Sequence, residues 1–370
     1  MYIFLYFFLL FLYILLKKNK NKKSSRQTYI IVATIILSLV SALRHKGVGI
    51  DTFAYYMSYS DIQNTTWSDI TNHIFSFFQG AVLKDPGYSL FNKICATILG
   101  PFEIYLFFVA LFFLSALGYI LYHSVEHLFG YVISYSYYIS LFYGFFPNSA
   151  IRQTVAMSFL LWAVIIYHKK HRFVIPAILF LFAFLIHKSV LFGLVPLCFL
   201  LIKNVKFIYR SALIITPLLF AVSLEFVRLL VLLSEAEHYM QYIEGEGGTS
   251  VVFIVEMCFF YLIGFAALKF INKERPYTKL AFISFALAIS IISFIRVDPS
   301  LQRLIAYFSI WGMVFLPNAL YYHKPFVRRI LIICVFALCI GRSVLIPTPY
   351  KFFWQYMNLS ERYDEIYRFY

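Results

Sequence analysis

The long uncharged stretches of this chain decide which folds it can adopt. Apolar runs recur along the sequence, and many approach the roughly 17–25 residues that a helix needs to cross the hydrocarbon core of a bilayer. Only 13% of the residues are charged and the mean hydropathy is +0.78, whereas a soluble domain carries about 25% charged residues. A transmembrane barrel would show alternating strands of about ten residues instead. The sequence therefore predicts an all-α polytopic membrane protein.

Clusters of basic residues separate these runs and indicate their direction. Five clusters hold 19 of the 32 Lys and Arg, and such loops lie on the cytoplasmic side of a membrane. They occupy residues 17–26, 168–172, 203–210, 269–279 and 323–329. If the N-terminus lies outside, alternation of the loops gives about twelve spans, puts every cluster inside and leaves the C-terminus outside.

We expect these spans to form one membrane domain covering residues 1–370. Their predicted ranges are 1–16, 28–43, 102–122, 129–146, 152–167, 173–187, 189–202, 207–226, 251–270, 278–296, 303–321 and 328–346. Three segments remain on the outer side: a long loop at 44–101, a second loop at 227–250 and a C-terminal tail at 347–370. Within the long loop, Asp85 and Pro86 are typical of a helix start, which predicts an interfacial helix from there.

Several polar residues fall at the outer ends of apolar helices, where charge is costly and usually functional. Arg44 and Asp51 flank a turn with two glycines, whose backbone amides can form an anion site; the alternative is a basic helix cap that reaches to the interface. Arg152 and Gln153 open the fifth span, at the positive end of the helix dipole. This placement favours a phosphate or another anion.

Two further groups lie on the same predicted side. His187 occupies a tight turn, where it can move a proton near neutral pH or simply be hydrogen-bonded in a helical hairpin. Arg296 and Arg303 surround the turn before the eleventh span. With Asp298 they form either an ion-pair staple or half of a pyrophosphate clamp, because the guanidinium group matches phosphate oxygens.

Other classes of function are disfavoured by the same sequence. The net charge of +15 is mostly the charge of the cytoplasmic clusters, so we predict no nucleic-acid partner and take the lipid bilayer as the counterpart. His123 and His127 are four residues apart but lack a third ligand, and we predict no metal and no cofactor. No nucleotide-binding, Asp-x-Asp or serine-hydrolase motif is present.

Four short motifs occur in order between residues 40 and 200: ALRHKGVGIDTFAYY, KDPGYSLFNKI, AIRQTVAMSFLLWA and FLIHKSVLFGLVPL. In this order and spacing they resemble the EpsG family, and the likeness extends loosely to LQRLIAYF near 301–308. Members of that family are similar to Wzy-type polymerases of exopolysaccharide, capsule and O antigen. The resemblance assigns the family's motif residues to Arg44, Asp51, Arg152 and His187, and its C-terminal part extends the assignment to Arg296 and Arg303.

The resemblance also carries expectations about the reaction. It implies a GT-C-like membrane glycosyltransferase of the bacterial inner membrane that needs no metal. Its substrate would be an oligosaccharide on undecaprenyl pyrophosphate, handled on the outer face, with a chain-length regulator as a further partner.

The resemblance also implies a mechanism that these residue types fit. The acceptor hydroxyl would attack the anomeric carbon of the donor, and undecaprenyl pyrophosphate would leave. His187 is the first candidate for the base and Asp51 the second, while Arg152 and Arg303 would hold the pyrophosphate and Arg44 with Asp51 would shape the loop above it. A repeat-unit flippase, a glycan ligase and a membrane O-acyltransferase remain as alternatives.

Overall fold

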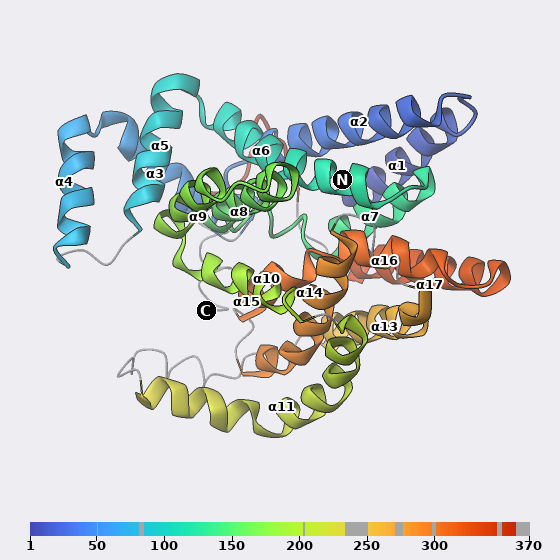
Figure 1. The fold of residues 1–370 in the computed structure, drawn as a ribbon. Helices are drawn as coiled ribbons and strands as arrows, with labels where there is room; N and C mark the ends of the chain where they lie inside the picture. Colours follow the sequence, from blue (N-terminus) through green and yellow to red (C-terminus); the bar gives the residue numbers. More distant parts are fainter. Residues whose placement is uncertain are drawn as a thin grey trace. The chain divides into compact units, whose positions relative to one another are not determined.

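The computed structural model describes residues 1–49, 51–80, 85–202, 204–233, 251–270, 277–297, 301–345 and 350–359. Within these ranges the secondary structure is helical, apart from one isolated β-bridge between Arg44 and Phe352, so the all-α prediction is confirmed (Figure 1). The chain divides into two compact units. The first contains Met1–Tyr122, Leu141–Leu191 and Ser343–Tyr370, and the second contains His123–Ser140 and Phe192–Arg342.

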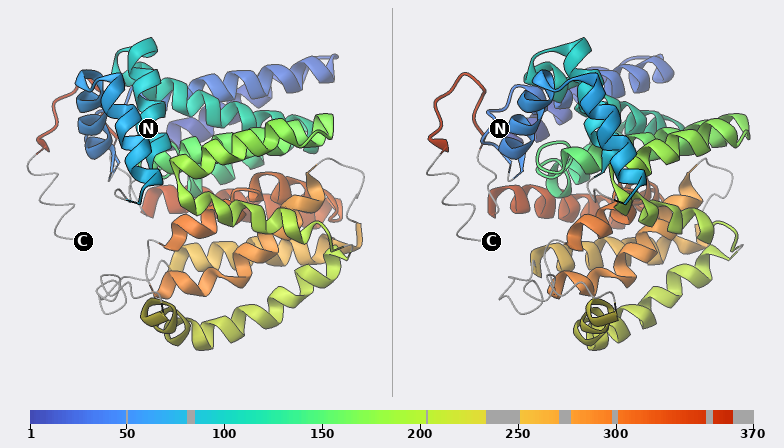
Figure 2. Two further views of the ribbon diagram at one scale, coloured as in Figure 1. Left: turned by 60° about the vertical axis from the view of Figure 1, so that its left-hand side comes forward. Right: turned by 90° about the vertical axis from the view of Figure 1, so that its left-hand side faces the viewer.

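The first unit is built from eight helices in the described residues. They are α1 (Tyr2–Leu16), α2 (Lys22–Ala42), α3 (Thr52–Asn64), α4 (Trp67–Phe78), α5 (Pro86–Leu99), α6 (Phe102–Ser124), α8 (Ile151–Lys170) and α9 (Val174–Ile186). Helices α2, α6 and α8 lie side by side, and α3, α4 and α5 run across their direction (Figure 2). Helix α9 packs against both α8 and α5, which connects the long outer loop to the helices of the bundle.

Side-chain contacts fix the directions of α2, α6 and α8. Arg26, near the start of α2, donates a hydrogen bond to the carbonyl oxygen of Tyr122, near the end of α6. Phe112 and Tyr119 of α6 contact Phe159 and Trp162 of α8 in the same order along both helices. Helix α6 is therefore antiparallel to α2 and parallel to α8.

These directions separate two kinds of charged residue within the first unit. The exposed lysines at the start of α2 and the basic last turn of α8 lie at one end. Arg44 follows α2, and Arg152 lies in the first turn of α8, so both lie at the other end. The predicted alternation of loops between the two sides of a membrane requires the basic clusters and these two arginines to lie at opposite ends. Which end faces the cytoplasm stays a prediction.

The second unit centres on α14 (Thr278–Ser290), a helix in which nearly every residue is buried. It packs against several other helices, among them α10 (Val195–Phe199), α11 (Val205–Leu233), α13 (Val251–Ala267) and α16 (Gly312–Tyr321). The remaining elements are α7 (Leu128–Leu141), η3 (Leu268–Phe270), η4 (Ile292–Arg296), α15 (Gln302–Ser309) and α17 (Pro325–Leu345), with η1 (Lys188–Leu194) entering from the first unit. Aromatic stacking fills the interior, for example between Phe285 and Phe315 at 4.2 Å between ring centroids.

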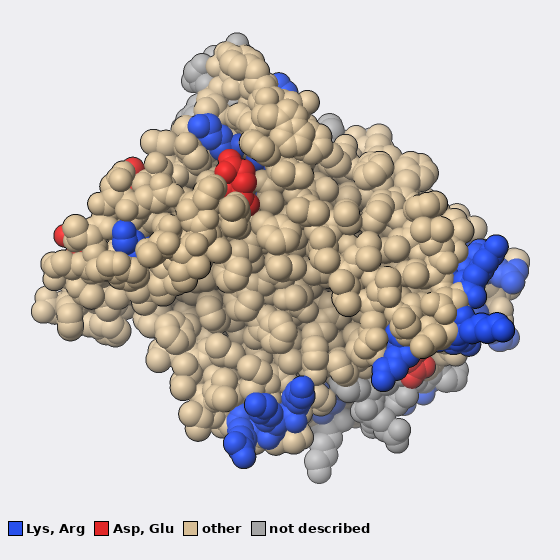
Figure 3. Space-filling model, turned by 90° about the horizontal axis from the view of Figure 1, so that it is seen from above, with Lys and Arg blue, Asp and Glu red and all other residues tan. Residues whose placement is uncertain are grey.

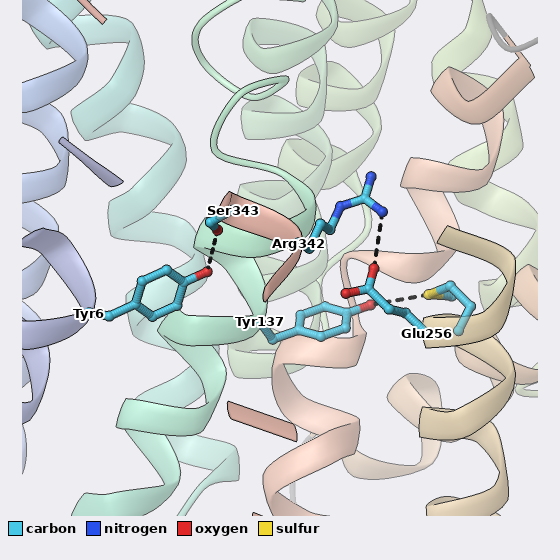
Figure 4. Close-up of polar contacts among 6 residues, drawn as sticks. Tyr6, Tyr137, Glu256, Arg342 and Ser343 are labelled. Carbon is cyan, nitrogen blue, oxygen red and sulfur yellow. Dashed lines mark hydrogen bonds and ion pairs between the residues drawn. The ribbon is translucent and has the colours of Figure 1, made fainter. Parts of the chain in front are cut away.

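One ion pair is buried inside the second unit. Arg342 Nη1 of α17 lies 3.0 Å from Glu256 Oε2 of α13, and the Glu256 side chain is only 1% exposed (Figure 4). Nearby, the hydroxyl of Tyr137 donates to the carbonyl oxygen of Ser309 at 2.6 Å. Inside an apolar helix bundle each of these charges depends on the other, because removing one partner would leave the other as an uncompensated buried charge.

The predicted spans agree with the helices in part. Four helices (α2, α6, α8 and the Val205–Glu225 part of α11) are long and apolar enough to cross a membrane, and α15 with α16 adds a fifth if the bent pair is one span. That pair bends by 48°. The apolar helices α1, α9, α13 and α14 are shorter. The count of twelve spans and a GT-C-like architecture therefore stay predictions.

Several span boundaries differ from the sequence-based ranges. Span 129–146 ends early, because α7 stops at Leu141 and turns follow. Span 189–202 is a 3₁₀ segment followed by the short α10, and Pro196 stands in the first turn of that helix, where proline is tolerated because its missing N–H has no partner to lose. Span 278–296 changes from α-helix to 3₁₀-helix at Ile291.

Apolar side chains cover much of the surface, as expected for a protein surrounded by lipid. Exposed large hydrophobic residues occur on both units, including Phe7 and Phe11 on α1, Ile214 and Leu218 on α11, and Ile333 on α17. On the face drawn in Figure 3, uncharged residues dominate and Lys and Arg form small separate groups. The chain is accordingly a multi-pass membrane protein in its helix composition and its surface.

The long outer loop contains more helix than the sequence predicted. The helix predicted from Asp85 and Pro86 is confirmed as α5, and its interfacial position stays a prediction. Helices α3 and α4 also form there, and α4 begins at a capping box in which Thr66 and Asp69 satisfy each other's backbone amides. The second loop, 227–250, is described only to residue 233, where α11 ends, and residues 234–250 lie outside the described part.

The C-terminal tail returns to the end of α2. His45 donates its backbone N–H to the carbonyl oxygen of Lys351 at 2.7 Å, and Phe353 donates to that of Leu43 at 2.9 Å. The Phe352 and Trp354 rings stack at 4.5 Å. Within the first unit, Tyr6 of α1 is also hydrogen-bonded to Ser343 at 2.9 Å (Figure 4).

Candidate functional site

The approach of α5 to α9 creates the candidate site. Gly87 lies in the first turn of α5 so close to α9 that a Cβ at this position would be 2.8 Å from the carbonyl carbon of Leu185. Only glycine allows this distance, because any side chain would overlap a backbone atom that cannot move aside. The contact brings the residue before α5, Asp85, to the end of α9, where His187 follows.

Asp85 is shared between two of the predicted site residues. Its Oδ2 lies 3.8 Å from Nη1 of Arg152 and 3.7 Å from Nδ1 of His187. The Asp85 side chain is 14% exposed, against 28% for His187 and 41% for Arg152. The carboxylate is thus largely enclosed while both cationic partners remain accessible to a ligand.

Two tyrosines complete the surroundings of Arg152. Its guanidinium carbon lies 5.9 Å from the ring centroid of Tyr55 and 5.8 Å from that of Tyr88, within cation–π range. Arg152 Nε also donates to the hydroxyl of Tyr55 at 3.5 Å. Tyr55 comes from α3 and Tyr88 from α5, so helices of the long outer loop orient an arginine of α8.

The start of α8 adds positive potential beside Arg152. Its N-cap residue, Ala150, provides no side-chain cap, and the first turn contains no acidic residue. The positive end of the helix dipole therefore favours an anion. Lys188, next to His187, lies with Nζ 5.2 Å from the Phe77 ring centroid at the end of α4. The site combines one carboxylate with several cationic groups.

Arg44 lies inside the first unit, with 1% of its surface exposed. Its Nη1 donates to Ser41, and its Nη2 donates to the carbonyl oxygens of Pro147 at 3.2 Å and Asn148 at 3.1 Å. Burial lowers the pKa of Arg44 to about 10, so the guanidinium stays charged at neutral pH. These contacts join the end of α2 to the segment that leads into α8 and support a positioning role. Direct contact of Arg44 with a substrate stays a prediction.

The other predicted residues of the first unit take different positions. Asp51 is the N-cap residue of α3, where its side chain makes no cap hydrogen bond, and it takes no part in the two ion pairs of Asp85. Gln153 faces the packed interior and is 2% exposed. Their roles as base and ligand stay predictions.

Arg296 and Arg303 belong to the second unit. Both are exposed, and the elements that carry them, η4 and α15, pack against each other. Arg296 Nη1 donates to the carbonyl oxygen of Phe220 on α11 at 3.1 Å. Asp298 lies outside the described residues. A pyrophosphate clamp that includes these two arginines stays a prediction.

The structure identifies one residue that the sequence did not single out for chemistry. Asp85 was interpreted as the start of a helix and as part of the KDPGYSLFNKI motif, without a role in the reaction. The useful signal was the spacing of KDPGY, in which an acidic residue precedes a glycine that permits close helix contact. Among the described residues, no group of three or more His, Cys, Asp and Glu side chains is placed to hold a metal ion.

The fold and the site together define a class: a helical, multi-pass membrane protein with an arginine–aspartate–histidine cluster at one end of its first unit. The family model for the EpsG family, a family of polysaccharide polymerase-like membrane proteins, matches residues 27–358. The chain belongs to the EpsG family. Comparisons with curated proteins and with solved structures give no match.

Proposed function

We propose that the protein is a polymerase that joins oligosaccharide repeat units carried on undecaprenyl pyrophosphate, at the outer face of a bacterial inner membrane. Family membership supports a polymerase-like role. The observation that carries the proposal is the placement of Arg152 and His187 at 3.8 Å and 3.7 Å from the same Oδ2 of Asp85. An anion-binding group and a proton acceptor then lie within one small site.

The proposed reaction is a glycosyl transfer. The oxygen of an acceptor hydroxyl forms a bond to the anomeric carbon of the donor sugar. The bond from that carbon to the phosphate oxygen breaks, and undecaprenyl pyrophosphate leaves with the electron pair. Charge builds up on the leaving group, and the guanidinium of Arg152 stabilises it. His187 accepts the proton of the attacking hydroxyl.

The accessibility of the side chains is consistent with these roles. Arg152 is 41% exposed although it is held by Tyr55 and Tyr88, so its orientation is fixed while several of its N–H groups can reach a ligand. The positive end of α8 would add to the attraction for pyrophosphate. The Tyr55 ring, which is only partly buried, also provides a surface on which a sugar can pack.

A reconstituted reaction tests the proposal. The purified full-length protein is supplied with one lipid-linked repeat unit in lipid vesicles, and the products are separated on a gel. A ladder of lengthening chains is expected. A ligase would transfer one glycan to a different acceptor, a flippase would move the lipid without changing it, and an acyltransferase would need an acyl donor. If the wild-type protein leaves the repeat unit unchanged, the proposal is wrong.

Matched variants connect the reaction to the site. Arg152→Ala and His187→Ala are each expected to slow chain growth by roughly 100-fold or more. Arg172→Ala and His171→Ala replace the same residue types in the exposed turn after α8 and should polymerise normally. Equal losses in site and control variants would contradict the assignment.

A further inference from the structure

Asp85 stands at a helix start but does not act as a cap. An aspartate at the N-cap position normally accepts hydrogen bonds from the amides of its own first turn. The Asp85 side chain makes no such bond, in contrast to Thr66 and Asp69 at the start of α4, which form a complete capping box. The carboxylate of Asp85 is directed to Arg152 and His187 instead.

We infer that Asp85 is a positioning residue that sets which nitrogen of His187 accepts the proton. The inference rests on the proposed polymerase function. Asp85 Oδ2 faces Nδ1 of His187 at 3.7 Å, so a proton on Nδ1 points toward the carboxylate. Nε2 then carries the free lone pair and is the atom available to the acceptor hydroxyl.

The same carboxylate stabilises the product of the proton transfer. When the sugar–oxygen bond forms and the pyrophosphate leaves, the hydroxyl proton moves to Nε2 and the imidazole becomes positively charged. Its neighbours Arg152 on α8 and Lys188 on η1 are also cationic, whereas Tyr55 and Tyr88, on α3 and α5, are neutral. Asp85 is the carboxylate that the ion pairs place next to this new charge, and an opposite charge at this distance favours the protonated ring.

Asp85 also restrains Arg152, because its Oδ2 lies 3.8 Å from Nη1 of that residue. The close contact of Gly87 with Leu185 holds the start of α5 in this position. One residue thus fixes the relative placement of the anion-binding group and the base. An aspartate whose carboxylate caps its own helix could not hold Arg152 and His187 in this way.

The first test compares rates of chain growth across pH 5 to 9 in the full-length protein. Asp85→Asn preserves shape and removes the charge, and the rate at neutral pH should fall by roughly 10- to 100-fold. The shape of the pH profile should also change, because the carboxylate near Nδ1 of His187 is gone. Asp85→Glu should restore both the rate and the profile. Asp61→Asn, at an exposed site on α3, should match the wild type.

A double-mutant cycle separates positioning from support of the fold. In a His187→Ala background, Asp85→Asn should cause little further loss, because the group that it positions is absent. An undiminished effect in that background would overturn the inference. So would a wild-type rate and pH profile for Asp85→Asn in a protein that forms the ladder. Absence of the ladder in the wild type would refute the polymerase itself.

A measurement on the wild-type protein does not depend on whether any Asp85 variant folds. The full-length chain is labelled with ¹⁵N-histidine, and the His187 signals are assigned by their loss in His187→Gln. Nitrogen shifts of the neutral ring should show the proton on Nδ1. A proton on Nε2 would overturn the inference, because the nitrogen assigned to take the acceptor's proton would already carry one.

Discussion

Gly87 of α5 lies against Leu185 of α9, with space for a hydrogen but not for a methyl group between them. This contact determines how closely the long outer loop approaches the turn that contains His187. A shift of even one ångström in such a contact can change the geometry of a site strongly. The glycine of the KDPGY motif, two residues after the aspartate, therefore sets how closely Asp85 approaches His187.

Gly87→Ala should weaken both the fold and the reaction. An added methyl group in a tightly packed contact costs typically about 1–3 kcal/mol, and the displacement should separate Asp85 from His187. Thermal unfolding in detergent micelles and the ladder assay measure the two effects. Gly341→Ala on α17 is the matched control, since a Cβ there meets no atom within 4 Å. Normal chain growth by Gly87→Ala would show that the contact can relax without cost.

Arg44→Ala should destabilise the first unit. It removes a buried charged donor and leaves the carbonyl oxygens of Pro147 and Asn148 without these bonds, and a hydrogen bond to a charged group contributes about 1.5–3 kcal/mol. Arg44→Lys keeps the charge but loses the forked geometry, so it should recover only part of the loss. The unfolding midpoint of both variants tests this. A variant with wild-type stability and no chain growth would point to a direct role in catalysis instead.

Stability should fall in weak acid because of His45. Burial, with smaller contributions from Lys46 and Lys351, lowers the pKa of His45 below its ordinary value of 6.5. The folded state thus binds a proton less readily than the unfolded chain, and its stability decreases as the pH falls below about 6.5 and through the lowered folded pKa. His45→Gln should show a smaller loss between pH 7.5 and pH 5. The exposed His171→Gln should leave the wild-type pH dependence unchanged.

The ion pair in the second unit should behave differently when one or both partners are replaced. Arg342→Met leaves Glu256 as a buried charge without its partner, and breaking such a pair costs about 3–5 kcal/mol. The double variant Glu256→Gln with Arg342→Met removes the unpaired charge and should recover most of that loss. The unfolding midpoints of the two single variants and the double variant give the coupling. If the loss in the double variant instead equals the sum of the two single losses, the pairing of Arg342 with Glu256 contributes little to stability.

The sequence predicted the features that depend on local pattern. Apolar runs and basic clusters were sufficient for the all-helical class and for the relative directions of α2, α6 and α8. The dipeptide of Asp85 and Pro86 predicted the start of α5. Arg152 and His187 were identified because polar residues at the ends of apolar helices are unusual. Each of these signals is contained in one short segment of the sequence.

The remaining features depend on contacts between distant segments. The ion pairs of Asp85 join residues that are 67 and 102 positions away, and no local pattern specifies such partners. Arg44 was expected at a ligand, but only packing reveals that its guanidinium is bound to backbone oxygens. The 48° bend between α15 and α16 was missed because hydropathy measures composition and not direction.

The carbonyl oxygen of Asn148 receives two hydrogen bonds, one from Arg44 Nη2 and one from Thr52 Oγ1 at 2.6 Å. It thereby connects the end of α2, the start of α3 and the approach to α8 at a single main-chain atom. No substitution at position 148 can delete a main-chain oxygen. Mutations can alter this junction only by replacing its two donors, Arg44 and Thr52, or by changing the path of the backbone. Variants selected for new substrates are therefore expected to keep both donors or to replace the junction as a whole.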